Sequence, residues 1–217
     1  MTKKKSYDEV SVVKALNRKA SINIKSEAMS DGIHGVINVL KNANDLGNSS
    51  WGKIDYLVKV HNYKMYIVDN IADYFLSKES ISPKKLQKLV YYGYAWTIAL
   101  LNDTAEDIHF KLFESDIEAW IHGPVIPDLY QKYKDLGWHD IPKVENFDES
   151  IFESEVLDIL NQVWNVYGKL TGNQLEMISH QEKPWIEARK GIPAYMASST
   201  LISDKDMFVY YNEQANS

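Results

Sequence analysis

The side chains most able to do chemistry are spread along this chain and do not form a known metal-binding or catalytic motif. No two histidines lie three or four residues apart, and the sequence HExxH is absent. Metal ligands on one helix need that spacing to share a face. The sequence therefore predicts no metal site. The six histidines are His34, His61, His109, His122, His139 and His180.

Motifs for nucleophilic catalysis and phosphate binding are missing as well. There is no GxSxG elbow to present a serine, and no GxxxxGK[ST] or GxGxxG loop. Asp116 and Glu118 would share one face of a strand, where repulsion could raise one carboxyl pKa. Carboxylates on an acidic segment more often form a solvated face. We therefore expect no catalytic residue, no cofactor and no enzymatic activity.

Two histidines, His122 and His180, lie at the ends of predicted elements, beside aromatic and proline residues. An imidazole in such a place commonly caps a turn or packs against it, and we expect that role for both. The tyrosines and tryptophans are more informative, because aromatic residues with one polar edge commonly anchor protein interfaces. The alternative is an aromatic core. We expect at least two of these residues at a partner-binding surface: Tyr91, Tyr92, Tyr94, Trp96, Trp120, Tyr130, Tyr133, Trp164 and Trp185.

The helix that would carry four of these aromatic residues begins at Ser82 and Pro83. Serine is a favoured N-cap and proline fits the first helical position. From Leu86 to Leu100, apolar residues recur at steps of three and four. This helix is apolar over much of its circumference, so it should lie at the centre of the core.

A short strand and a rigid turn follow this helix. Residues 115–121 alternate between two faces, which is typical of a strand. We expect residues 109–112 to be its partner, giving at most a small β-hairpin. Pro124 and Pro127 lack a backbone N–H, so we expect them to end the strand and fix the start of the next helix.

Helical patterns account for most of the chain after Met65, so the sequence predicts a mainly α (α+β) fold. An acidic, irregular stretch at 138–149 interrupts them and should be an exposed loop. The other expected helices cover about 66–77, 125–137, 151–168, 171–178, 184–188 and 203–211.

The distribution of charge divides the chain into two modules. Residues 1–64 contain 11 Lys/Arg and 6 Asp/Glu, a net charge of 11 − 6 = +5, whereas residues 65–217 contain 13 and 24, giving 13 − 24 = −11. We expect a small helical N-terminal module at 1–64 and a larger domain at 65–217. Three short helices in the first module fit either a helix-turn-helix that binds DNA or a bundle that docks on another surface. No basic cluster marks the start of a recognition helix.

The composition bears on the cellular compartment in which we expect this protein. Cysteine is absent, so the chain has no disulfide and no thiolate metal site. No apolar segment follows the basic start, and no apolar run approaches the roughly 20 residues of a membrane-spanning helix. We expect a cytoplasmic protein that does not bind a membrane.

Three ordered segments of the acidic domain resemble the Panacea family, which is similar to SocA and to phage GepA-like proteins. They are KLQKLVYYGYAW at 85–96, FESDIEAWIHGPVIPDLYQKYK at 113–134 and TGNQLEMISHQEKPWIEARK at 171–190. The resemblance extends from Met65 to about Lys190, roughly 125 of 217 residues. The third segment has the family's L–H–PW–AR arrangement at Leu175, His180, Pro184, Trp185, Ala188 and Arg189.

The resemblance implies an antitoxin of a toxin–antitoxin system, of a kind found in bacteria and on phages. Members neutralise protein toxins by direct binding, and one branch acts as an adaptor that delivers its toxin to an ATP-dependent protease. An alarmone-synthetase-like translation inhibitor is one kind of toxin that the family implies. The family has no established catalytic residues. Residues 1–64 would be one of its variable N-terminal extensions, some of which bind DNA.

We therefore expect a non-enzymatic antitoxin that binds a cognate toxin and occludes it. We select Tyr91, Tyr92, Trp120, His122 and Trp185 as anchors or organisers of the binding surface. Two alternatives remain open, a proteolytic adaptor and an autoregulator that binds operator DNA through residues 1–64. The identity of the toxin and the oligomeric state, including a homo-oligomer, also remain open.

Overall fold

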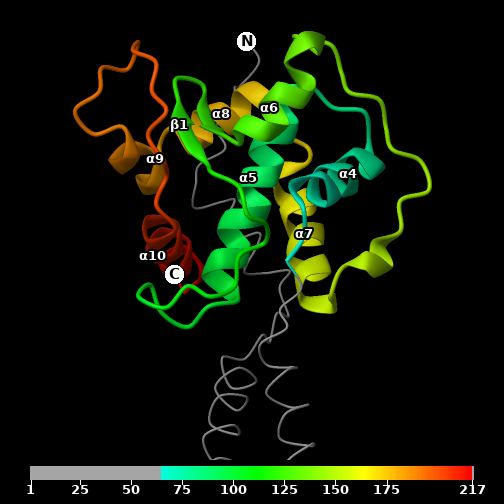
Figure 1. The fold of residues 1–217 in the computed structure, drawn as a ribbon, viewed down its shortest axis with the longest axis horizontal. Helices are drawn as coiled ribbons and strands as arrows, with labels where there is room; N and C mark the ends of the chain where they lie inside the picture. Colours follow the sequence, from blue (N-terminus) through cyan, green and yellow to red (C-terminus); the bar gives the residue numbers. More distant parts are fainter. Residues whose placement is uncertain (1–64, 217) are drawn as a thin grey trace, which may run out of the picture. The chain divides into compact units, whose positions relative to one another are not determined.

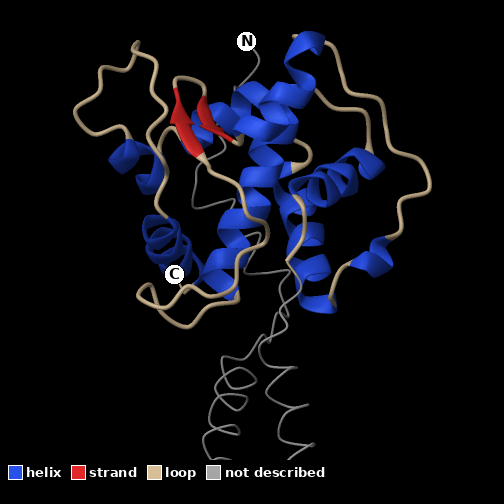
Figure 2. Cartoon of the chain, viewed as in Figure 1, coloured by secondary structure: helices blue, strands red, loops and turns tan. Residues whose placement is uncertain are grey.

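The structure, a computed structural model, describes residues 65–216, and the predicted N-terminal module at 1–64 lies outside them. The described part is mainly helical and contains one two-stranded antiparallel sheet, which confirms the predicted fold class (Figures 1 and 2). The α-helices are α4 (Val68–Lys78), α5 (Pro83–Leu100), α6 (Pro127–Tyr133), α7 (Ser154–Tyr167), α8 (Gly172–Ser179), α9 (Lys183–Ala188) and α10 (Asp204–Ala215). Two 3-10 turns, η2 (Lys134–Leu136) and η3 (Glu149–Ile151), and the strands β1 (Glu118–Trp120) and β2 (Gly123–Val125) complete the fold.

Helix α5 is the centre of the core, as predicted. Ser82 is its N-cap and accepts the Lys85 N–H, and Pro83 occupies the first turn. Every residue from Leu86 to Ala99 is buried. Helices α4, α7, α8 and α10 all contact α5, and Figure 1 shows it between α4 and α7 on one side and α10 on the other.

The tyrosine hydroxyls of α5 are satisfied inside the core. The buried carboxylate of Glu182 accepts the hydroxyls of Tyr92 at 3.2 Å and of Tyr211 at 2.7 Å. The Tyr211 hydroxyl also lies 3.2 Å from that of Tyr91. Burial, and then the negative charge of Glu182, raise the pKa of all three phenols well above its ordinary value. These tyrosines therefore stay neutral; Tyr92 and Tyr211 donate to Glu182, and Tyr91 is hydrogen-bonded to Tyr211.

The hairpin differs from the prediction in its second strand. Strand β1 pairs with residues 123–125, with Ala119 opposite Pro124, and residues 109–112 are not its partner. Instead, Asn102 binds the backbone N–H and C=O of Phe110, at 2.8 and 2.9 Å. These backbone groups are therefore unavailable for pairing with β1.

Pro124 does not end the strand but lies within β2. Its partner Ala119 directs its N–H to Thr200 O, at 2.8 Å, and its C=O to Arg189. A missing N–H at Pro124 therefore removes no ladder hydrogen bond. On the far side of β1, Ile202 donates to Ile117 O at 2.8 Å, so residues 200–202 run antiparallel to β1 at its other edge.

Smaller boundary differences follow from local caps. Helix α4 starts at Val68 rather than Tyr66, because Ile67 is the extended N-cap residue, and it is 66% exposed. Val125 belongs to β2 and not to α6. The loop at 138–149 is largely exposed, but Ile141 is buried and donates its N–H to Ile81 O. The predicted capping box of Thr171 is confirmed at the start of α8.

Candidate functional site

Two polar side chains of α5 hold the second strand of the hairpin. The amide of Gln87 accepts the Ile126 N–H at 2.9 Å and donates to the Ile126 C=O at 3.2 Å, so it pairs with the chain as a neighbouring strand would. Lys88 donates from Nζ to Pro124 O at 2.8 Å. Both side chains are buried. Their polar groups inside an otherwise apolar helix are explained by this contact with the hairpin backbone.

Gly123 allows this close approach. Its φ of +94° is in the region that favours glycine. A Cβ at this position would lie 2.9 Å from Lys88 Nζ and 2.9 Å from Ser179 Oγ. The hairpin, α5 and α8 therefore meet at a point where a larger residue does not fit.

The ammonium of Lys88 is in an unusual environment. Its side chain is 1% exposed, and this burial lowers its pKa from 10.5 to about 7. The carboxylate of Glu176 opposes this shift, while the positive charge of Lys84 adds to it. Near neutral pH, Lys88 is therefore present in both its charged and its neutral form.

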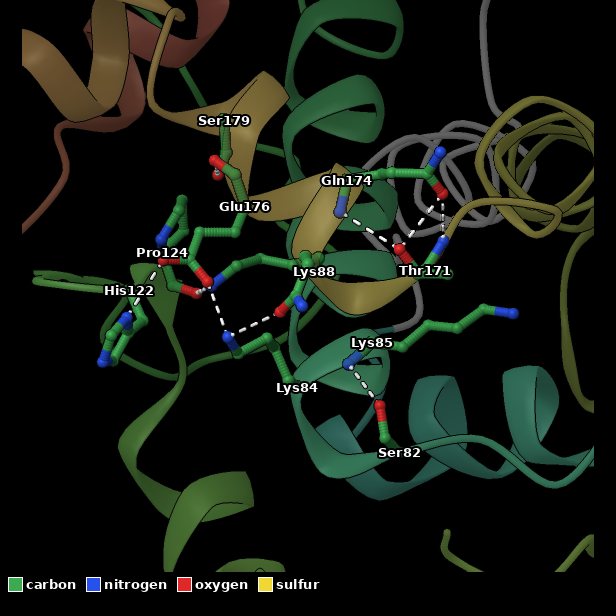
Figure 3. Close-up of polar contacts among 11 residues, drawn as sticks. Ser82, Lys84, Lys85, Lys88, His122, Pro124, Thr171, Gln174, Glu176 and Ser179 are labelled. Atoms are coloured by element: carbon green, nitrogen blue, oxygen red, sulfur yellow. Dashed lines mark hydrogen bonds and ion pairs between the residues drawn. The ribbon is translucent and has the colours of Figure 1, made fainter. Parts of the chain in front are cut away.

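A second polar cluster joins α5, α8 and the hairpin at the surface (Figure 3). Glu176 of α8 binds Lys84 Nζ at 2.7 Å and His122 Nδ1 at 3.0 Å. Burial alone would raise the pKa of the Glu176 carboxyl, but the hydrogen bonds from Lys84 and His122 hold it below its ordinary value. The side chain of His122 is 66% exposed, so the turn of the hairpin presents an imidazole to solvent.

Helix α9 holds the first strand. Trp185 donates its indole N–H to Trp120 O at 3.0 Å. Arg189 donates from one terminal nitrogen to Ala119 O at 2.8 Å and from the other to Met196 O at 2.6 Å. Trp185 and Arg189 of the third sequence segment thus bind the backbone of the second segment, and Arg189 also binds the loop after α9.

His180 ends α8 and packs against the following helix, so its predicted packing role is confirmed. Its backbone N–H bonds Glu176 O, and its ring stacks on Trp185 with 4.0 Å between centroids. Burial lowers the pKa of its imidazole, and the nearby Lys88 and Arg189 charges lower it further. A neutral ring fits this stacked position.

The structure brings three of the five predicted site residues together. Trp120 and His122 lie on the hairpin, and Trp185 contacts Trp120 from α9. Tyr91 and Tyr92 are 0% exposed in α5, so they cannot anchor a partner in this structure. The anchoring role predicted for these two tyrosines is corrected, because Glu182 and the packed rings satisfy their hydroxyl groups internally. A role for them in organising the surface stays a prediction.

Several residues of the site were not among the five selected from the sequence, although Tyr130 was one of the nine aromatic candidates. Tyr130 of α6 is 39% exposed and meets the Trp120 ring edge-on, with 4.8 Å between centroids. Gln87, Lys88 and Arg189 donate hydrogen bonds to backbone C=O groups of the hairpin and of Ile126. Two adjacent polar residues within an apolar helix were a detectable signal for Gln87 and Lys88, but nothing local indicated which backbone they bind.

Among residues 65–216, no group of three or more His, Asp or Glu side chains is arranged to hold a metal ion. Within the same range, no helix has the length and apolar character needed to cross a membrane.

The geometry defines a mainly helical domain in which three separate sequence segments meet at one hairpin. Residues 86–186 match the family model described as antitoxin SocA-like, Panacea domain. This match supports the resemblance of the domain to the Panacea antitoxin family. No curated protein and no solved structure matches the chain significantly.

Proposed function

We propose that this protein is a non-enzymatic cytoplasmic antitoxin that neutralises a protein toxin through the surface around the β1–β2 hairpin. One observation carries the choice of surface. All three segments that resemble the family supply either the hairpin or the side chains that hold its backbone: Gln87, Lys88, Trp185 and Arg189. The match of residues 86–186 to the antitoxin family model supports the antitoxin role.

The hairpin surface has the chemistry of a protein-binding site. Trp120 and Tyr130 form a partly exposed aromatic pair, and His122 extends beside them. Gln87, Lys88 and Arg189, which hold the hairpin and its flanking backbone, are buried. The hairpin that carries Trp120 and His122 is therefore positioned before a partner arrives, which lowers the entropic cost of binding. Occlusion of a toxin would use an interface of standard size, roughly 1,600 Å² in total. The family supports a cognate toxin such as an alarmone-synthetase-like translation inhibitor as the partner.

The experiment is co-expression of the full chain with each adjacent reading frame, scored by growth and by co-purification. We expect one neighbour to stop growth alone and to be neutralised in a stable complex with this chain. A neighbour whose level falls only in cells with an intact ATP-dependent protease would instead indicate the adaptor mechanism. Harmless neighbours that do not co-purify would contradict neutralisation of an adjacent gene product.

A further inference from the structure

A groove lies beside the exposed face of β1. It has a volume of about 370 Å³ and is lined by Glu118, Trp120, Ile121 and residues 197–199; we call it the β1 groove. The loop that forms its far wall is fixed to β1, since Arg189 bridges Ala119 O and Met196 O and Ala119 donates to Thr200 O. Figure 1 shows this loop, which follows α9, next to β1. The groove is therefore built by the fold.

The β1 groove continues into a larger cleft with a different character, because Glu118 lines both. This cleft, of about 690 Å³, holds five carboxylates and one lysine, a net charge of 1 − 5 = −4; we call it the acidic cleft. Leu201 lies on its wall and is 53% exposed. The charged lining residues are Lys111, Glu114, Asp116, Glu118, Asp128 and Asp204.

Only part of this negative charge is compensated within the described chain. Lys111 is bound to Asp204 at 2.8 Å, and Ser115 donates to Asp128 at 3.0 Å. Glu114 and Asp116 are exposed; both attract the Lys111 ammonium electrostatically, but neither forms an ion pair or side-chain hydrogen bond among residues 65–216. These two carboxylates are therefore available to a cation from outside.

Charge complementarity selects the occupant of this surface. A second copy of the chain would bring a net charge of 5 − 11 = −6, and nucleic acid would bring phosphates, so both would be repelled. The partly exposed Trp120 and Ile121 and the exposed Leu201 favour a partner with apolar side chains of its own.

We infer that the β1 groove and the acidic cleft together bind a segment of the toxin in which an apolar side chain lies beside arginine or lysine. This inference rests on the proposed function and names the chemistry of the partner. The apolar side chain would enter the β1 groove next to Trp120. The neighbouring cation would bind Glu114 and Asp116 in the acidic cleft.

The test uses the full chain, labelled with ¹⁵N, and a synthetic peptide, acetyl-Leu-Arg-Val-Arg-Leu-amide, in low salt. We expect it to shift the indole N–H resonance of Trp120 and the amides of residues 197–199. A peptide with glutamine in place of both arginines should bind roughly 5-fold more weakly, because it keeps the apolar contacts and loses the charge. The double variant Glu114→Gln/Asp116→Asn should weaken binding of the arginine peptide to a similar degree.

The matched control is Asp140→Asn/Glu145→Gln, which removes the same charge from the exposed loop between α6 and α7 and should leave binding unchanged. Equal affinity for the two peptides, shifts confined to another surface, or no shift at millimolar peptide would overturn the inference. Co-expression separates it from the proposed function. If the Glu114→Gln/Asp116→Asn variant neutralises and binds the toxin as well as the unaltered chain does, the inference fails and the antitoxin function stands. If the unaltered chain does not neutralise but the arginine peptide binds as described, the function fails and the binding surface stands.

Discussion

At the scale of single residues, Lys88 combines a charge with nearly complete burial. Within the described part of the chain its ammonium donates to Pro124 O, while Glu176 supplies a more distant opposite charge. Burying an ammonium with so few partners costs free energy, which appears as a lowered pKa. The contact that holds β2 therefore depends on a group that titrates near neutral pH.

This environment predicts a pH-dependent stability. The pKa of Lys88 is about 7 in the folded protein, against an ordinary value of 10.5 that we assign to the unfolded chain. Between pH 7 and 9 the unfolded chain holds this proton and the folded chain releases it, so the free energy of unfolding rises with pH. The free energy of unfolding of the unaltered chain, measured relative to that of Lys88→Met, should increase by about 1–2 kcal/mol between pH 7 and 9. This value follows from the lowered pKa. Urea denaturation of both proteins at the two pH values measures this, and a pH-independent difference would show that Lys88 titrates normally.

Gly123 gives a second prediction at this scale. Gly123→Ala places a methyl group 2.9 Å from Lys88 and Ser179 at a φ of +94°. We expect it to lower the free energy of unfolding by about 2–3 kcal/mol. Gly137→Ala is the matched control, since its φ is +58° but nothing lies within 4 Å of the added atom. Its ψ of −110° lies outside the left-handed helical region, so the added methyl group should cost about 1–2 kcal/mol, from backbone conformation alone. Equal losses in thermal or chemical denaturation would mean that the close packing at Gly123 contributes nothing.

At the scale of elements, the hairpin is held mainly by side chains from helices. Its two strands have three residues each, and an isolated hairpin of that size is marginal in water. Gln87 binds the N–H and C=O of Ile126, and Arg189 and Trp185 bind C=O groups of β1, whose other edge is paired with residues 200–202. Side chains from the helical part of the domain therefore supply part of the hydrogen bonding that further strands of a larger sheet would provide.

Gln87→Leu tests this replacement. The variant keeps a side chain of similar size but leaves the buried N–H of Ile126 without its partner, while the Ile126 C=O keeps the bond from the Tyr130 N–H. We expect a loss of about 2 kcal/mol in the free energy of unfolding. Gln181→Leu, at an exposed position after α8, is the control and should change stability by less than about 0.5 kcal/mol. A Gln87→Leu protein as stable as the control would show that the hairpin does not need this amide.

The helices were predicted well, because the capping residues and apolar spacing that indicate a helix lie within it or directly beside it. Ser82-Pro83 and the capping box at Thr171 define helix starts within a few residues of sequence. The partner of β1 was predicted wrongly, because pairing depends on competition from Asn102 for the backbone of 109–112. Proline in β2 was likewise unexpected, since its tolerance depends on where Ala119 directs its hydrogen bonds.

The site was only partly predictable for the same reason. Trp120, His122 and Trp185 stood out by residue type and lie together in the fold. Tyr91 and Tyr92 stood out equally but are buried, because Glu182, about ninety residues along the chain, accepts from Tyr92 and Tyr211. Nothing in the sequence next to Glu182 indicates that its carboxylate is buried and accepts these hydrogen bonds.

At the scale of the whole molecule, binding of the toxin should depend on the hairpin surface and not on exposed aromatic residues in general. Trp120→Ala removes the centre of that surface, and we expect a loss in affinity of roughly 10-fold or more for the toxin identified by co-expression. Trp138→Ala is the control, because Trp138 is 81% exposed in the loop after α6 and belongs to neither the β1 groove nor the acidic cleft. Titration calorimetry measures both affinities, and circular dichroism checks that both variants are folded. If Trp120→Ala unfolds the protein, Trp120 is a core residue and the proposed anchor is wrong.

The side-chain supports of the hairpin also determine when it can form during folding. Gln87 lies 39 residues from Ile126, Trp185 lies 65 residues from Trp120, and Arg189 lies 70 residues from Ala119. Closing such long loops costs chain entropy before any contact compensates for it. The hairpin should therefore become ordered late, after α5, α8 and α9 have assembled around the core. Its amides should also exchange with solvent deuterium before those of α5 in transient openings of the native protein.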